Sequence, residues 1–211
     1  NDYLRRLNMN EAQVFKQEDF LGEIFENEAK ALLSDIMSST SLVSLMYAFE
    51  EEQVHKAIEY IVGIFNECYK FGHLKVATSS SELTLCGYAM IFVHPHHQSA
   101  YLHKIQIFEQ FRGRGLGTEM LQSLSQSFSD LGLICNNDKI KFYERNGFKC
   151  VGDYKVPDSD DFKMSKHMYT GLYLMSNSQK VDGCPVFFLN DADLRAIGSI
   201  SGNFSYLHQS R

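Results

Sequence analysis

The stretch IQIFEQFRGRGLGTEML, residues 105–121, places three glycines between an alternating apolar segment and an apolar helical pattern. The alternation predicts a strand over residues 100–108, and the helix that follows is expected to begin near Gly117. Because glycine has no Cβ, consecutive backbone N–H groups of the loop can turn inward without steric clash. These amides and the positive end of the helix form a cradle suited to phosphate, to which Arg112 and Arg114 add positive charge.

Two common nucleotide-binding motifs do not fit this loop. The phosphate-loop motif G-x-x-x-x-G-K-S/T needs a lysine after its last glycine, and none is present. The dinucleotide motif G-x-G-x-x-G needs a glycine at the position of Thr118. The pattern that does fit is R/Q-x-x-G-x-G/A, formed by Arg112, Gly115 and Gly117. On this pattern alone, a glycine-rich turn that holds no ligand is the alternative interpretation.

A second motif, NNDKIKFYERNGF, occupies residues 136–148. It predicts a short helix that ends at Asn146-Gly147, a pair that favours the left-handed backbone conformation after a helix. The stretch matches the signature N-x-x-x-x-x-F/L/I-Y-E-x-x-G-F. Together with the glycine loop, it resembles the coenzyme-binding and thiol-facing motifs of the GNAT acetyltransferase superfamily, over about residues 83–150.

The resemblance implies an α/β fold with a mixed central sheet flanked by helices, and an N-acetyltransferase that uses acetyl-CoA as co-substrate. It places Ile105 and Ile107 along the pantetheine arm by main-chain pairing, with the Ile105 amide facing the thioester oxygen. It places Asn136 near the coenzyme. It places Tyr143 beside the coenzyme as the acid that protonates the leaving CoA thiolate. The residues that it places at the pyrophosphate are Arg112, Gly113, Arg114, Gly115, Leu116, Gly117 and Thr118.

Transfer to an amine also needs a proton acceptor, because an amine attacks a thioester only in its neutral form. Strand alternation predicts that His103 shares a face with Ile105 and Ile107. The segment LHKIQI resembles a strand of arylalkylamine N-acetyltransferases in which a histidine at this position helps to take the amine proton. We therefore expect His103 to be the base, with a purely structural histidine as the alternative. The opposite face of the strand would carry Leu102, Lys104, Gln106 and Phe108.

The period of the apolar residues predicts the remaining elements. Two amphipathic helices are expected, from Leu21 to Ile36 and from Val54 to Cys68. After these helices the expected elements include both hairpins and strand–helix–strand crossovers. This order predicts one α/β sheet that contains parallel and antiparallel strand pairs. Further strands are expected at residues 12–16, at 73–93 as two strands with a turn at Ser79–Ser81, and at 131–135, 148–154 and 168–175.

Domain organisation follows from the extent of these patterns. We expect one acetyltransferase domain over residues 1–178, frayed over about residues 1–10. A C-terminal extension over residues 179–211 is expected to pack on the same domain.

Composition narrows the class of partner. The net charge of −6 argues against a general nucleic-acid binder, which would need a basic face. Five cysteines without a C-x-x-C pair predict reduced thiols in a cytoplasmic protein. No apolar run has the length of a membrane span, so no membrane partner is expected. The histidines of HPHH, residues 94–97, are expected in a solvated turn, and no metal is predicted.

The acceptor is not identified by the sequence, and a small-molecule or peptide amine fits equally well. A homodimer is compatible with the sequence. Two other classes of function also fit the glycine loop. One is a CoA-binding module without catalysis that acts in regulation or interaction, and the other is a nucleotide-binding domain that uses the same anion cradle.

Overall fold

The fold is defined by a computed structural model, which describes residues 17–39, 42, 49–81, 84–93, 96, 99–178, 186–187 and 189–200. One sheet of six strands runs through these residues in the order β1-β2-β3-β4-β6-β5. Within this sheet β3 and β4 are parallel and the other neighbours are antiparallel, which confirms the expected mixed sheet. The strands are β1 (Leu74–Ser81), β2 (Thr84–Val93), β3 (Ala100–Ile107), β4 (Leu131–Cys135), β5 (Lys149–Asp153) and β6 (Tyr173–Ser176). The helices are α1 (Leu21–Ser38), α2 (Glu51–Lys70), α3 (Leu116–Ser127), α4 (Ile140–Arg145) and α5 (Asp191–Ser199).

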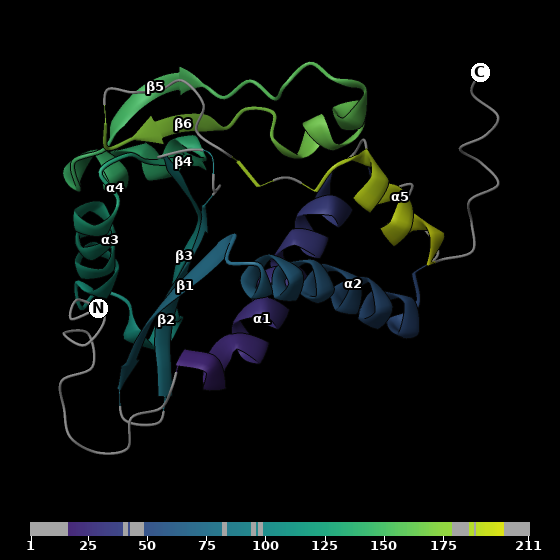
Figure 1. Cartoon of the computed structure of the whole chain (residues 1–211), viewed down its shortest axis with the longest axis horizontal. Helices are drawn as coiled ribbons and strands as arrows, with labels where there is room; N and C mark the ends of the chain where they lie inside the picture. The colour runs from purple at the N-terminus through teal and green to yellow at the C-terminus, as the bar shows by residue number, and fades with distance from the viewer. Residues whose placement is uncertain are drawn as a thin grey trace.

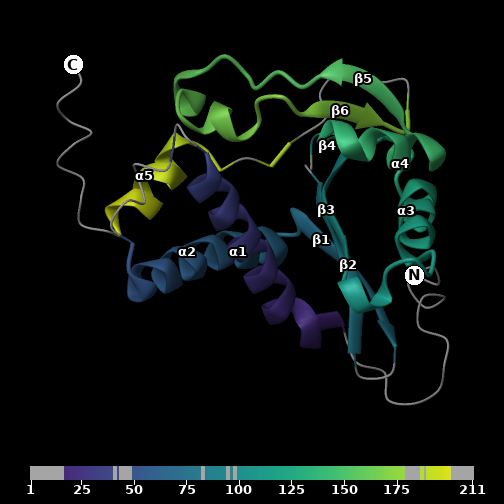
Figure 2. The ribbon, with the colours of Figure 1, turned by 180° about the vertical axis from the view of Figure 1, so that it is seen from behind.

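Helices cover the sheet from both sides. α1 and α2 cross on one side of β1–β3, whereas α3 lies on the other, as the front and back views show (Figures 1 and 2). The core is accordingly divided into two buried clusters. One lies beneath α1, α2 and α5, and the other beneath α3 and α4. Successive residues of a strand pack in different clusters, as Met90 and Ile91 of β2 do.

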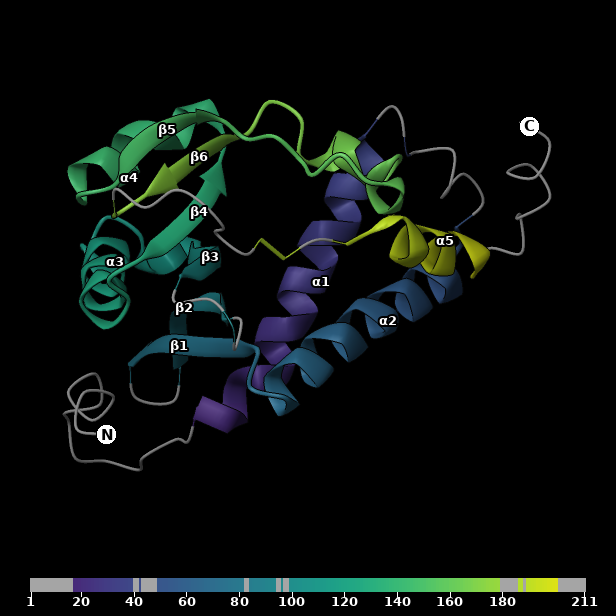
Figure 3. The ribbon, with the colours of Figure 1, turned by 45° about the horizontal axis from the view of Figure 1, so that its top comes forward.

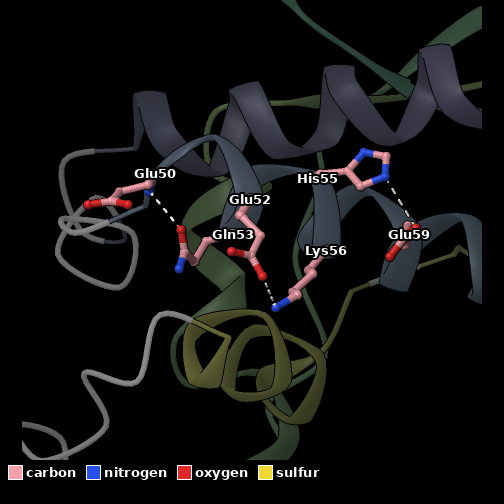
Figure 4. Close-up of polar contacts among 6 residues, drawn as sticks. All are labelled: Glu50, Glu52, Gln53, His55, Lys56 and Glu59. Carbon is pink, nitrogen blue, oxygen red and sulfur yellow. Dashed lines mark hydrogen bonds and ion pairs between the residues drawn. The ribbon is translucent and has the colours of Figure 1, made fainter.

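The two N-terminal helices form where the apolar spacing predicts them. On α1 the residues at intervals of three and four are buried against the sheet and α2. The first turns of α2 carry exposed polar pairs three or four residues apart, which stabilise a helix modestly. These pairs are Glu50–Gln53, Glu52–Lys56 and His55–Glu59 (Figure 4).

The hairpin between β1 and β2 differs from the prediction. β1 continues through Ser81, which pairs with Thr84, so the turn predicted at Ser79–Ser81 is wrong. The serine run is instead accommodated within the strand, where the register shifts between Ser79 and Ser80.

The last strand is shorter than predicted. Of the expected residues 168–175, those before Tyr173 do not join β6. A 3-10 turn occupies Ser165–Met168, and Gly171 has a φ of +81°, which interrupts an extended chain. The predicted strand at residues 12–16 and most of the HPHH turn lie outside the described residues.

β3 contains an extra residue at His103. Met90 of β2 pairs with Lys104, but the next residue, Ile91, pairs with Leu102. His103 therefore has no residue opposite it, which is the arrangement of a β-bulge. Such a bulge shifts the alternation of the strand by one position.

This shift decides which side chains of β3 face which helices. Leu102 before the bulge and Ile105 and Ile107 after it all pack in the cluster beneath α3, whereas His103 contacts α1. The prediction that His103 shares a face with Ile105 and Ile107 is therefore wrong, because a count with period two assumes no extra residue. Phe108, predicted on the face of Leu102, packs in the α1–α2 cluster instead.

The C-terminal helix packs against the same core as the N-terminal pair. Leu189, Leu194 and Ile197 are buried in the α1–α2 cluster. Tyr60 of α2 donates a hydrogen bond to Asp193 Oδ1 at 2.9 Å. The division of the chain into a domain and an extension at residue 178 stays a prediction.

Candidate active site

The centre of the sheet is open on one side of β3. β3 and β4 pair only at Ala100–Leu131 and Tyr101–Gly132, although β3 continues to Ile107. Beyond Tyr101 the edge of β3 towards β4 therefore has no strand partner. An open strand edge offers its N–H and C=O groups to an extended ligand.

The backbone groups that face this opening are those of Ile105 and Ile107. Phe108 donates its N–H to the carbonyl oxygen of Cys86 on β2 at 3.0 Å. Because main-chain groups alternate in direction along a strand, those of Ile107 and Ile105 point away from β2. The Ile107 carbonyl agrees with this direction, since it accepts a hydrogen bond from Arg112 Nε in the glycine loop at 3.0 Å.

A cleft of about 520 Å³, called here the loop cleft, follows the opening. Gly113 and Gly115 have φ values of +76° and +83°, which glycine adopts freely. A Cβ built on Gly113 would meet no atom within 4 Å, and one on Gly115 would meet only Glu119 Oε1 at 3.9 Å. The space before these glycines is thus open. The cleft is lined by Ile105, Gln106, Ile107, Phe111, Arg112, Gly113, Gly115, Leu116, Gly117, Thr118, Lys139, Phe142 and Tyr143.

One predicted loop residue does not line this cleft. Arg114 donates from Nη2 to the Gln110 carbonyl oxygen at 3.2 Å, and its guanidinium lies 5.5 Å from the centre of the Phe111 ring. Conversely, Lys139 and Phe142 line the cleft but were not predicted. Both lie within NNDKIKFYERNGF, where the signature specifies an apolar residue at Phe142 and leaves the position of Lys139 open.

Tyr143 lies on α4 at the inner end of the loop cleft. Its ring packs between those of Phe142 and Phe148, with ring centres 5.2 and 5.9 Å away. Burial, with a further contribution from Cys135, raises the pKa of the Tyr143 phenol well above its ordinary value. The hydroxyl therefore keeps its proton at neutral pH and is able to donate it.

A second hollow of about 710 Å³ meets the loop cleft and is called here the helix-side pocket. Ile105, Lys139 and Tyr143 line both spaces, so the two meet at these side chains. Asn136, expected near the coenzyme, lines the helix-side pocket and not the loop cleft. The remaining walls are formed by Glu28, Leu32, Asp35, Ser38, Ser39, Tyr101, His103, Lys104, Ile134, Cys135, His167, Met168, Tyr169, Thr170 and Leu172.

Three charged or titratable side chains meet in the wall of this pocket. Glu28 Oε1 lies 3.1 Å from His103 Nε2, and Glu28 Oε2 lies 3.1 Å from Lys104 Nζ. Burial raises the pKa of Glu28, but His103 and Lys104 outweigh this effect and hold the pKa below its ordinary value. Glu28 is therefore an ionised carboxylate on the buried face of α1, and the ammonium of Lys104 balances its charge.

His103 is surrounded by aromatic rings, those of Phe65, Phe92, Tyr101 and Phe187, at centre distances of 5.3 to 6.2 Å. Neither imidazole nitrogen makes a well-aligned hydrogen bond to a described residue, and both are buried. The ring is thus held by packing and by the close approach of Glu28.

Two carboxylates of the pocket were missed by sequence reasoning. Glu28 follows Ile24 by four residues on the apolar face of α1, and an acid in an apolar stripe is a signal that could have found it. Asp35, about two turns further along α1, also lines the pocket. Burial, with the charge of Glu28, raises the pKa of Asp35 against the opposing charge of Lys104. No comparable signal marks Asp35, because an exposed acid near the end of a helix is ordinary.

Three other sequence predictions concern the cysteines, metal binding and membrane spans. Cys68, Cys86, Cys135 and Cys150 are free thiols, and Cys184 lies outside the described part of the chain. Within that part, no cluster of three or more metal-ligating side chains occurs, although two of the HPHH histidines fall outside it. No described helix combines the length and apolar character that crossing a membrane requires.

The sequence itself matches a family model. Residues 66–150 match the acetyltransferase domain of the GNAT superfamily. Residues 66–150 thus resemble a GNAT acetyltransferase domain. The matched region begins within α2 and includes the opening beside β3, the glycine loop and Tyr143. The expected resemblance is thereby confirmed, and with it an acetyltransferase-type α/β fold.

Solved structures similar to this protein include an N-acetyltransferase from Staphylococcus aureus Mu50, with 16% identity and a TM-score of 0.49 over 75% of this chain and 95% of that chain. The paiA N-acetyltransferase from Thermoplasma acidophilum, in complex with coenzyme A, has 13% identity and a TM-score of 0.43 over 72% of this chain and 94% of that chain. A spermidine N-acetyltransferase from Vibrio cholerae has 18% identity and a TM-score of 0.43 over 56% and 73%. Similarity at this level does not identify a substrate. No protein of curated function matches the sequence.

Proposed function

We propose that the protein is an N-acetyltransferase that moves an acetyl group from acetyl-CoA to a primary amine by direct attack. The observation that carries this proposal is the meeting of two different hollows at Tyr143. One has an open strand edge and a glycine cradle, and the other has carboxylates and a histidine. A donor with a phosphate-bearing tail fits the first, and a cationic acceptor fits the second.

The residues of the loop cleft fit coenzyme A. Inward-facing amides of Gly113 to Thr118 at the start of α3 would hold a pyrophosphate. The main-chain groups of Ile105 and the N–H of Ile107, which face the opening, would pair with the amide-bearing arm. When bound, acetyl-CoA supplies an acetyl group activated as a thioester. Lys139 would add a positive charge beside the loop.

Proton donors and acceptors are placed on suitable sides of the junction. Tyr143 holds a proton at neutral pH and would donate it to a thiolate. His103 lies beside the Glu28 carboxylate in the wall of the helix-side pocket, and we assign it the proton of the attacking amine. Both imidazole nitrogens are buried, so one water would link the ring to the acceptor. Asp35 would attract the ammonium form of the acceptor.

A covalent acetyl-enzyme is not needed. Cys135 is the cysteine in the wall of the helix-side pocket, and burial raises the pKa of its thiol to about 11. A thiol rather than a thiolate at neutral pH is a poor nucleophile. This supports direct attack by the amine. The choice between small-molecule and peptide amines, the cytoplasmic location and a homodimer all remain predictions.

An acceptor panel with release of free thiol as the readout tests this function. The panel contains polyamines, aromatic amines, amino acids, aminoglycosides and peptides with free N-termini, each with acetyl-CoA. We expect saturable thiol release with at least one class, and loss of most of it in Tyr143→Phe. A thermal-shift series with acetyl-CoA, ATP and NAD runs in parallel. Stabilisation by acetyl-CoA without turnover would point to a silent CoA-binding module, and stabilisation by ATP or NAD alone to a nucleotide-binding domain.

A further inference from the structure

Part of the wall of the helix-side pocket has little regular structure of its own. It is the segment between β5 and β6 that contains the 3-10 turn Ser165–Met168 and continues to Leu172. His167, Met168 and Tyr169 of this segment line the pocket. A short 3-10 turn satisfies few backbone groups internally. Its position must therefore be fixed by contacts from elsewhere.

A buried carboxylate from the C-terminal part of the chain provides such a contact. Asp191, in the first turn of α5, is only 2% exposed. Both of its oxygens accept from the N–H of Met164 at 3.0 Å, and Oδ1 also accepts from the N–H of Ser165 at 2.8 Å. Hydrogen bonds to a charged acceptor are stronger than neutral ones, and a buried charge is costly unless it is satisfied. Asp191 thus fastens the start of the wall segment.

Two further contacts extend this attachment to the pocket itself. The N–H of Leu189 donates to the hydroxyl of Tyr169 at 3.1 Å. The ring of Phe187 stacks on that of Phe92 with centres 4.3 Å apart, and it meets the ring of His103 edge-on at 5.3 Å. The same short stretch of chain therefore touches both the pocket wall and the histidine assigned as the base.

The stretch is itself anchored in the core. α5 runs beside α2 and the wall segment, as Figure 3 shows. Leu189, Leu194 and Ile197 are buried with α1 and α2, and Asp193 bonds Tyr60. The stretch therefore packs on the core formed with α1 and α2 and, through Asp191, also bonds the wall segment. These contacts fix the wall relative to the two helices.

We propose that Phe187 and residues 189–199, together called the C-terminal clamp, position the wall of the acceptor site and the ring of His103 for binding of the acceptor. Asp191 is the positioning residue that holds the wall, and Phe187 supports the ring of His103. The inference rests on the proposed function. It adds to that function a segment that lies outside the matched region 66–150. The glycine loop makes no part of the clamp, so binding of CoA does not depend on it.

The test compares Asp191→Ala with two matched variants. Asp191→Asn removes the charge but keeps one oxygen acceptor, which can take the place of Oδ1 and accept from the N–H groups of Met164 and Ser165. Asp193→Ala removes an equal charge from the same helical turn, with its bonds to Tyr60 and to the N–H of Asn190, so it weakens the anchor of the clamp but removes no bond to the wall. Each variant is measured for cooperative thermal unfolding, for CoA affinity by calorimetry, and for KM and kcat with the best acceptor of the panel. Hydrogen exchange across residues 164–172 reports on the wall, and the imidazole resonances of His103 report on the ring.

For Asp191→Ala we expect exchange at Met164 and Ser165 to rise about 10- to 100-fold, the scale of losing charge-assisted hydrogen bonds. The acceptor KM should rise about 10-fold, with CoA affinity within twofold of wild type. Asp191→Asn should restore part of both effects, and Asp193→Ala, which keeps every bond to the wall, should change exchange at Met164 and Ser165 and the acceptor KM less than Asp191→Ala does. Unchanged exchange, an unchanged acceptor KM, or equal effects in Asp193→Ala would overturn the inference. Absence of wild-type turnover would refute the proposed function, and exchange together with the His103 resonances would then decide the clamp alone.

Discussion

The two hollows that meet at Tyr143 are built in opposite ways. The loop cleft comes from nearby stretches of chain, residues 105–118 and 139–143, and much of it is backbone. The helix-side pocket draws on α1, β3, β4 and the wall segment, and its chemistry lies in side chains. A ligand that all members of a family share can be bound by a local backbone motif. An acceptor that differs between members needs side chains that distant parts of the fold bring together.

The largest effect on the backbone side is expected from Gly115→Val. A β-branched residue is strained at a φ of +83°, and its side chain would fill the open space before the loop. We expect CoA affinity, measured by calorimetry, to fall about 100-fold or more.

The control for this substitution is Gly72→Val. Gly72 has a similar φ of +75° and lies at the end of α2, away from the cleft. It should lose comparable stability and keep its affinity for CoA. Equal CoA affinity of folded Gly115→Val and wild type would remove the loop from the CoA site.

At the junction, Tyr143→Phe should lower kcat about 10- to 1,000-fold and leave CoA affinity nearly unchanged, the pattern of a lost proton donor. Because burial raises the pKa of this phenol, no loss of activity from its ionisation is expected in the range of pH 7 to 9. Tyr88→Phe is the control, since Tyr88 is a buried tyrosine that lines neither hollow. Wild-type turnover in Tyr143→Phe would show that another group donates the proton.

On the side-chain side, His103→Ala should lower kcat/KM at neutral pH about 10-fold or more. The rate should recover towards high pH, where the amine is already neutral, and the acidic limb of the pH profile should flatten. His55→Ala removes an exposed histidine from α2 (Figure 4) and should alter neither. An unchanged pH profile in His103→Ala would make this histidine structural.

A smaller effect is expected from Glu28→Gln, which tests the charge beneath that histidine. The folded pKa of Glu28 lies below the ordinary value of 4.5, so the ionised carboxylate stabilises the fold at neutral pH. This contribution is lost as the pH falls through the folded pKa. At pH 7 the free energy of unfolding of the variant should be about 1 to 3 kcal/mol lower than that of wild type.

The stability of Glu28→Gln should also depend less on pH below 4.5 than that of wild type. Chemical denaturation at pH 7 and at pH 3 to 4.5 measures both quantities. Glu26→Gln, in an exposed pair with Lys30 on the same helix, is the control. A variant as stable as wild type at pH 7 would contradict the assigned ion pair.

The same contrast explains how much could be predicted. The strand, turn and helix around the glycine loop and the two N-terminal helices were predictable because each depends on local spacing, which a sequence displays directly. The role of Tyr143 was inferred from the family resemblance and stays a prediction. The bulge at His103 was not, because an extra residue depends on the partner strand and leaves no mark in the period of β3. Asp191 was missed for a related reason: its hydrogen bonds reach Met164 and Ser165, 27 and 26 residues earlier in the chain. Glu28 was the exception, since its place in an apolar stripe could have been noticed.

The central claim is that the open edge of β3 receives the donor, and residue-resolved hydrogen exchange with and without CoA tests it most directly. The alternation of main-chain groups along β3 gives a specific pattern: the amides of Ile105 and Ile107 face the opening, whereas that of Phe108 is bonded to β2. CoA should therefore slow exchange at Ile105, Ile107 and residues 113–118, with little change at Gln106 and Phe108. Equal protection of neighbouring amides along β3, or protection confined to residues outside the loop cleft, would contradict the account.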